Sequence, residues 1–212
     1  MKYWPLIGLA LLVGCDKKKH TLPLQPSVAS IVPSQATLSV YAIAGQSNSL
    51  YMAQQQLEYI RQSLGAVAVV SCGVGSTQMS RWTQGGDLYS GCKDLINETL
   101  AANPGSTLKG IMFWQGESDC NAIDAPLWVG RFRHMVDGYR LTWPNLLIVF
   151  AQITDTHTEQ RDEMRAYQAG VYIPNVTMIG TDGITYVGDH TDEAGYRIMA
   201  DRFIQAIARA VT

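Results

Sequence analysis

A serine at the end of an apolar segment and a distant histidine could together do nucleophilic chemistry. Residues 40–44 are apolar and are followed by Gly-Gln-Ser-Asn, which places Ser47 just after a predicted strand. His190 stands in the polar segment Gly-Asp-His-Thr-Asp. A neutral imidazole could accept the Ser47 proton and later return it to a leaving alkoxide. Alternatively, Ser47 is a helix N-cap and His190 a solvated loop residue.

Two further positions could stabilise the negative oxygen that forms during acyl transfer. Gly75 lies in the segment GVGST, and a glycine lets a backbone N–H approach a ligand closely. Gln115, in WQGES, could add a side-chain amide donor, and the Ser47 backbone N–H could be a third. GVGST is not a phosphate loop, because no Gly-Lys-Ser/Thr follows, but a flexible loop is the alternative.

Five apolar segments of strand length alternate with five predicted helices. The segments are 40–44, 66–71, 109–114, 146–152 and 176–180, and the helices lie near 50–63, 88–102, 124–141, 159–172 and 192–210. This alternation predicts one α/β domain with a parallel sheet. Ligands of such folds bind beyond the carboxyl ends of the strands. Ser47, Gly75, Gln115 and His190 all follow predicted strands.

Composition limits the partners that we expect. The 212 residues are 47% hydrophobic and 16% charged, with a net charge of −2, which suits one domain with a sizeable core. A nucleic-acid-binding protein would normally show a basic patch, so with this net charge we expect no nucleic-acid partner. The four histidines lack the usual spacings of metal ligands, so the sequence predicts no metal and no other cofactor.

Four segments together resemble the SGNH (GDSL-like) hydrolases. They are GQSN, GVGSTQMSRW, MFWQGESD and DHTDEAGYRIMADRF, and they extend over about residues 39–210. GQSN with WQGES is most similar to a branch of carbohydrate acetylesterases that includes sialate O-acetylesterases and acetylxylan esterases. The resemblance implies a three-layer α/β/α, flavodoxin-like fold with a five-stranded parallel sheet. No Gly-x-Ser-x-Gly elbow is present, which disfavours the α/β-hydrolase fold.

The resemblance also implies roles for individual residues. Ser47 would be the nucleophile and His190 the general base, with Gly75, Gln115 and the Ser47 N–H as the oxyanion hole. Trp82 would line the substrate pocket. An Arg and a Gln in the segment MRAYQ, residues 164–168, would help to order the site.

One position departs from the family pattern. The acid that orients the histidine usually stands three residues before it, where this chain has Val187. The candidates to replace that acid are Glu117, then Asp182, then Asp189, although a Ser–His dyad can also work without one.

The expected function is that of a serine esterase that removes O-acetyl groups from a carbohydrate through an acetyl-enzyme. A catalytically weak or inactive glycan-binding relative is the main alternative, because Val187 replaces the usual acid. A lipid or thioester hydrolase is a weaker alternative, since the loops are polar and lack a long apolar lid.

The first 15 residues have the pattern of an export signal. Lys2 precedes an apolar run that is too short to span a bilayer, and the segment ends in Leu-Val-Gly-Cys, which resembles a lipobox. We therefore expect a lipoprotein signal peptide at 1–15, a lipid on Cys15, a flexible tether at 16–38 and the hydrolase domain at 39–212. The protein would be anchored to a membrane of the bacterial cell envelope, facing the periplasm or the exterior. Export permits a disulfide among Cys72, Cys92 and Cys120, but the sequence does not select the pair.

Overall fold

The computed structural model of the protein describes residues 38–155 and 161–210. The predicted signal peptide, the lipid on Cys15 and nearly all of the tether fall outside the described residues and stay predictions. Within the described ranges, no helix is long and apolar enough to cross a membrane.

The centre of the domain is a sheet of five parallel strands in the order β2-β1-β3-β4-β5. The strands are β1 (Leu38–Gly45), β2 (Ala68–Ser71), β3 (Ser106–Trp114), β4 (Leu147–Ala151) and β5 (Val176–Ile179). The interior of β1 is buried on both faces, which is typical of parallel sheets covered by helices on each side. Each of the five strands overlaps one of the predicted apolar segments, which confirms the predicted strands.

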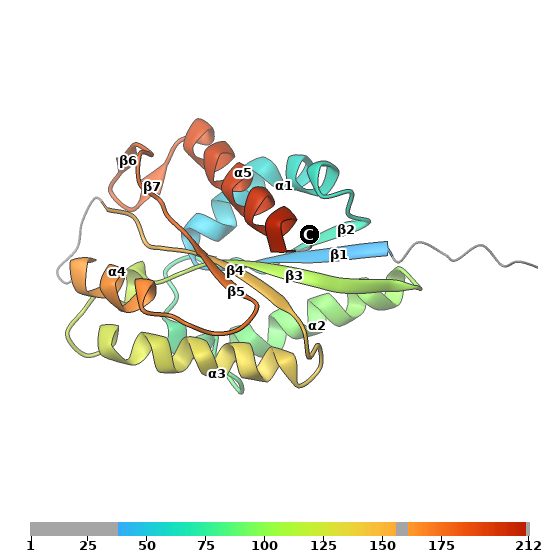
Figure 1. Ribbon diagram of the computed structural model, residues 1–212, viewed down its shortest axis with the longest axis horizontal. Coiled ribbons are helices and arrows are strands. Elements are labelled where there is room, and N and C mark those ends of the chain that lie inside the picture. The colour runs from blue at the N-terminus through green and yellow to red at the C-terminus, as the bar shows by residue number, and fades with distance from the viewer. Residues whose placement is uncertain (1–37, 156–160, 211–212) are drawn as a thin grey trace, which may run out of the picture. The chain divides into compact units, whose positions relative to one another are not determined.

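Helices cover both faces of the sheet, which confirms the three-layer α/β/α fold (Figure 1). α1 (Ser47–Ser63) and α5 (Glu193–Ala210) pack on one face through a core that includes Met52, Ile60 and Phe203. The other face carries α2 (Asp87–Ala102), α3 (Trp128–Arg140) and α4 (Arg161–Ala169). α3 begins later than predicted because Pro126 lies in a separate short 3-10 turn, Ala125–Leu127.

The strand order places a topological switch point at the carboxyl ends of β1 and β3. The chain leaves β1 toward β2 on one side and then crosses to β3 on the other, and ligands bind at such a switch point. Gly45 ends β1 with φ +123°, and a β-carbon there would collide with the carbonyl of Trp114. This glycine therefore lets the turn after β1 lie directly against the end of β3.

A small antiparallel hairpin within the described residues is not predicted by the sequence. It consists of β6 (Tyr186–Val187) and β7 (His190–Thr191) and lies beside α5 (Figure 1). Asp192 caps α5 by accepting a hydrogen bond from the Gly195 backbone N–H. A β-carbon on Gly195 would collide with the Thr191 side chain, so this glycine lets α5 pack closely against the hairpin.

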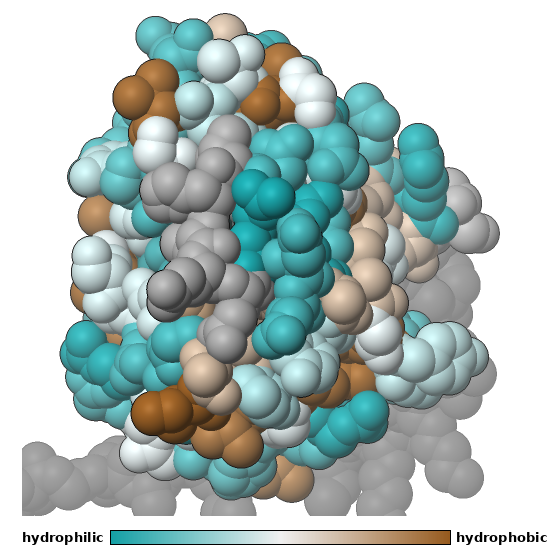
Figure 2. Space-filling view, turned by 90° about the vertical axis from the view of Figure 1, so that its left-hand side faces the viewer, coloured by the Kyte–Doolittle hydropathy of each residue, from teal (hydrophilic) through white to brown (hydrophobic). Residues whose placement is uncertain are grey.

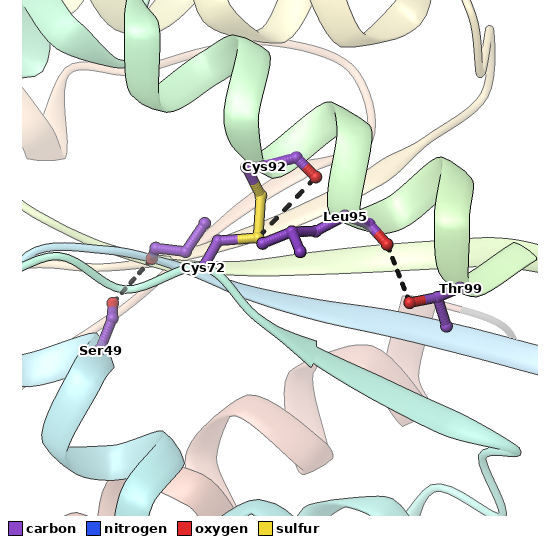
Figure 3. The surroundings of a disulfide bond; sticks show 6 residues. Ser49, Cys72, Cys92, Leu95 and Thr99 are labelled. Atoms are coloured by element: carbon purple, nitrogen blue, oxygen red, sulfur yellow. Dashed lines mark hydrogen bonds between the residues drawn. A yellow bond between two sulfur atoms is a disulfide. The ribbon is translucent and has the colours of Figure 1, made fainter.

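The structure selects one disulfide from the three cysteines. Cys72, directly after β2, is bonded to Cys92 in α2 (Figure 3). Cys120 keeps its thiol, which donates a hydrogen bond to the carbonyl of Gly116.

Candidate active site

Ser47 and His190 come together at the carboxyl edge of the sheet. The Ser47 hydroxyl oxygen lies 2.9 Å from Nε2 of His190, although 143 residues separate the two in sequence. Ser47 is the first residue of α1, and Gln46 occupies the N-cap position without a side-chain capping bond. The alternative of Ser47 as a helix N-cap is therefore wrong. A Ser–His pair at this distance can transfer a proton from the hydroxyl to the imidazole.

Gly75 lies next to Ser47, as the sequence predicts. A β-carbon placed on Gly75 would be 3.8 Å from the Ser47 β-carbon. The loop is held against the end of β1 because the Val74 N–H donates to the Gly45 carbonyl. Ser47 opens a helix, where the first backbone N–H groups have no acceptor within the helix. The N-terminus of α1 can thus present N–H groups to an oxyanion, and Gly75 lies close enough to Ser47 to supply another.

The Gln115 side chain is directed into the interior of the domain. It is fully buried, and its side-chain amide donates to the Thr77 carbonyl and to the carboxylate of Asp119. Its carbonyl oxygen accepts a bond from the Trp128 indole N–H. Both amide protons are therefore engaged, and the structure contradicts the prediction that Gln115 supplies an oxyanion donor. Gln115 instead supports the Gly75 loop through Thr77.

The predicted role of Trp82 in a substrate pocket is also wrong. Its side chain is fully buried, and its indole N–H donates to the Thr77 hydroxyl. It packs in the core against Phe113 and cannot line a substrate pocket. The exposed aromatic residue at the site is Tyr51, whose ring meets the His190 ring edge-on at 5.0 Å. Tyr51 lies one helical turn after Ser47, and that spacing could have identified it.

Gln46 joins the two motifs on which the family resemblance rests. Its Oε1 accepts hydrogen bonds from the backbone N–H groups of Gly116 and Ser118, at 3.3 and 3.2 Å. Gly116 has φ +152°, and a β-carbon there would collide with Ile153. The glutamine of GQSN and the glycine of WQGES thus have complementary structural roles.

Arg165 and Gln168 order the segments that follow β3 and β4, as the resemblance implies. The Gln168 side chain donates to the Gln115 carbonyl and accepts from the Ile153 N–H. Arg165 donates to the Ile153 carbonyl and pairs with Asp182 at 2.6 Å.

Neither Glu117 nor Asp182 hydrogen-bonds to His190. Glu117 is buried, accepts a bond from Asn48 through Oε1, and its Oε2 has no hydrogen-bond partner among the described residues. Burial raises the pKa of Glu117 to about 7. Asp182 is bound to Arg165 instead. The prediction that Glu117 orients the imidazole directly is therefore not supported by the structure.

Asn48 is a site residue that sequence reasoning missed. It is fully buried beside Ser47, and its side-chain amide donates to the backbone carbonyl of Asp189 and to Glu117. The hydroxyl of Tyr196 donates to its Oδ1. The motif GQSN carries a signal, because two amides flank the serine, but the partners of Asn48 are remote in sequence.

A comparison with known proteins identifies the family of the chain. A family model described as "Carbohydrate esterase, sialic acid-specific acetylesterase" matches residues 28–209. The chain belongs to this family. The resemblance that the motifs suggested is thereby confirmed.

A curated relative resembles this carbohydrate esterase family member at low sequence identity. A probable carbohydrate esterase of Arabidopsis thaliana is 22% identical over 161 residues, which cover 74% of this chain and 61% of the relative. The chain therefore spans about three fifths of the length of that curated relative.

Solved structures agree with the fold. A crystal structure of a protein from Arabidopsis thaliana has a TM-score of 0.69 at 17% identity, covering 82% of this chain and 99% of its own. NanS has a TM-score of 0.64 at 14% identity, with 82% and 97% covered. A G-D-S-L family protein from Desulfitobacterium hafniense has a TM-score of 0.55 at 16% identity, with 80% and 99% covered. These likenesses confirm the SGNH type of fold for this family member.

Proposed function

We propose that the protein is a serine esterase that removes O-acetyl groups from a carbohydrate. The observation that carries the proposal is the 2.9 Å contact between Ser47 and His190 at the topological switch point of the sheet. Membership of a carbohydrate esterase family supports the substrate class.

The reaction would proceed through an acetyl-enzyme. His190 Nε2 accepts the proton of the Ser47 hydroxyl, which requires the ring's own proton on Nδ1, and the serine oxygen attacks the acetyl carbonyl carbon. The N–H groups of Ser47 and Gly75 stabilise the resulting oxyanion. The C–O bond to the sugar then breaks, and His190 protonates the sugar oxygen. In the second half, His190 takes a proton from water, whose oxygen attacks the acetyl carbonyl carbon. The bond from that carbon to the Ser47 oxygen then breaks, and His190 returns the proton to the serine oxygen, which releases acetic acid.

The surface around the carboxyl ends of the strands supports a polar substrate. Outside the residues drawn in grey, much of the face in Figure 2 is hydrophilic, and its hydrophobic groups form separate patches. A long acyl chain would need a continuous apolar wall, whereas a short acetyl group on a sugar would not.

A series of acyl esters tests this proposal directly. With the same leaving group, we expect kcat/KM for acetate to exceed that for octanoate by about 100-fold, because the described residues of this face show no continuous apolar wall for the chain. Acetylated sialic acid and acetylated xylan then distinguish sugar substrates. Faster hydrolysis of octanoate would favour the lipid or thioester hydrolase, and binding of an acetylated sugar without acetate release would favour the inactive glycan-binding relative.

Val187 offers a gain-of-function test of the mechanism. It is the residue directly opposite His190 in the β6–β7 hairpin, and paired residues of antiparallel strands project from the same face. The Val187 side chain is 87% exposed, so an aspartate there would not be buried. We expect Val187→Asp to raise kcat by about threefold to tenfold, because a carboxylate would stabilise the imidazolium that forms during acylation.

Val187→Asn is the matched control for this substitution, since it has the same shape without the charge. Equal kcat values for the two variants would show that a carboxylate at position 187 does not stabilise the imidazolium. Steady-state kinetics with a chromogenic acetate ester provide the measurement.

A further inference from the structure

The segment that carries His190 has little support from its own hairpin. β6 and β7 contain two residues each, and in the described part of the chain they pair only with one another. An isolated two-stranded hairpin is at best marginally stable in water, even when it is longer than this one. The alignment of His190 with Ser47 must therefore depend on contacts with the rest of the domain.

Asn48 makes such a contact. Its Nδ2 donates a hydrogen bond of 2.9 Å to the carbonyl oxygen of Asp189, the residue directly before His190. Asn48 itself directly follows Ser47 in the first turn of α1. One hydrogen bond thus links the chain neighbours of the two residues that would exchange a proton.

The orientation of the Asn48 amide is determined by its other two partners. Nδ2 also donates to Oε1 of Glu117 at 2.9 Å, and Oδ1 accepts from the Tyr196 hydroxyl at 3.1 Å. A flipped amide would turn its oxygen toward the Glu117 carboxyl group and the Asp189 carbonyl, both of which can accept hydrogen bonds. The side chain is fully buried, so water cannot replace a lost partner.

We propose that Asn48 is a positioning residue for the Ser47–His190 pair and that Glu117 and Tyr196 act through it. The proposal rests on the proposed esterase function and deepens it. An acid at position 187 would help to align the imidazole with Ser47. Here Asn48 provides part of that alignment, through its hydrogen bond to the backbone carbonyl of Asp189. Glu117 then affects catalysis without touching the imidazole.

Two substitutions at position 48 separate this role from simple packing. Asn48→Ala removes all three hydrogen bonds, whereas Asn48→Asp keeps the shape and the acceptor for Tyr196 but loses both N–H donors. We expect kcat for an acetate ester to fall by about 100-fold in each variant with KM changed by less than about threefold, because misplacing a catalytic group by about 1 Å has effects of this size.

Ser49→Ala is the matched control. Ser49 is buried in the same turn of α1, and its hydroxyl donates to the carbonyls of Ala44 and Trp114 rather than to the His190 segment. We expect this variant to lose thermal stability comparably to Asn48→Ala but to keep kcat within about threefold of the wild type. Parallel losses of kcat and stability in all three variants would overturn the positioning role.

Tyr196→Phe provides a second route if the position 48 variants do not fold. It removes only the hydroxyl, which orients the Asn48 amide and also contacts the Thr191 backbone. We expect kcat to fall several-fold, with a loss of stability no greater than that of Ser49→Ala. Unchanged kcat in this variant would overturn the proposal. If the wild type itself shows no turnover, the esterase function fails instead, and a crystal structure of Asn48→Ala decides the positioning role. A retained hydrogen bond between Ser47 and His190 in that structure would contradict it.

Discussion

Ser47→Ala is expected to lower kcat/KM for acetate esters by about 10⁴-fold or more, because no other side chain would replace the nucleophile. His190→Ala is expected to have an effect of similar size, since the serine hydroxyl is a poor nucleophile without a base at 2.9 Å. Initial rates with a chromogenic acetate ester, compared with buffer alone, provide the measurement.

The double variant gives the sharper form of this test. Residues that act as one unit have strongly non-additive effects, so Ser47→Ala with His190→Ala should be no slower than either single variant. His134→Ala is the histidine control, because His134 is exposed in α3 and should leave the rate unchanged. A wild-type rate equal to that of Ser47→Ala would contradict the esterase function and favour the glycan-binding alternative.

Removal of the Cys72–Cys92 disulfide is expected to lower the free energy of unfolding substantially. The bond closes a loop with a sequence separation of 20 residues. Chain entropy predicts a stabilisation of about 3 kcal/mol for a loop of this size, which corresponds to a Tm decrease of about 6–12 °C for a domain of this length. Cys72→Ala with Cys92→Ala, followed by thermal unfolding, measures the decrease.

Two controls identify the disulfide as the cause of that decrease. A reducing agent should lower the Tm of the wild type but not that of the double variant. Cys120→Ala should leave the effect of the reducing agent intact, because Cys120 lies outside the disulfide. Equal Tm values for the oxidised wild type and the double variant would show that the bond contributes nothing to the folded state.

The sequence predicts the sheet and the positions of Ser47 and His190 well for a physical reason. Apolar segments of strand length are a local signal, and a parallel sheet necessarily gathers the loops after its strands at one edge. The hairpin around His190 could not be predicted, because two-residue strands are too short to show a periodicity. Its position depends on Asn48 and Gly195, whose contacts are tertiary.

The wrong predictions concern side chains whose direction is determined by tertiary packing. Gln115 follows β3 at the expected place, but the direction of its amide depends on Asp119, Thr77 and Trp128. Trp82 follows the Gly75 loop, yet it is buried against Phe113. The partners of Asn48 are 69, 141 and 148 residues away in sequence, so its role could not be read from its neighbours.

The side-chain oxygen of Gln46 has a consequence for how such chains can diverge. Because it accepts hydrogen bonds from the turn after β3, a substitution at 46 alone would leave the buried N–H of Gly116 without its acceptor, at a cost of about 1–3 kcal/mol. Changes at 46 and in the turn at 116–118 are therefore epistatic and are tolerated best together. GQSN and WQGES behave as a single inherited signature, and genome searches gain discrimination when they require both motifs in one chain.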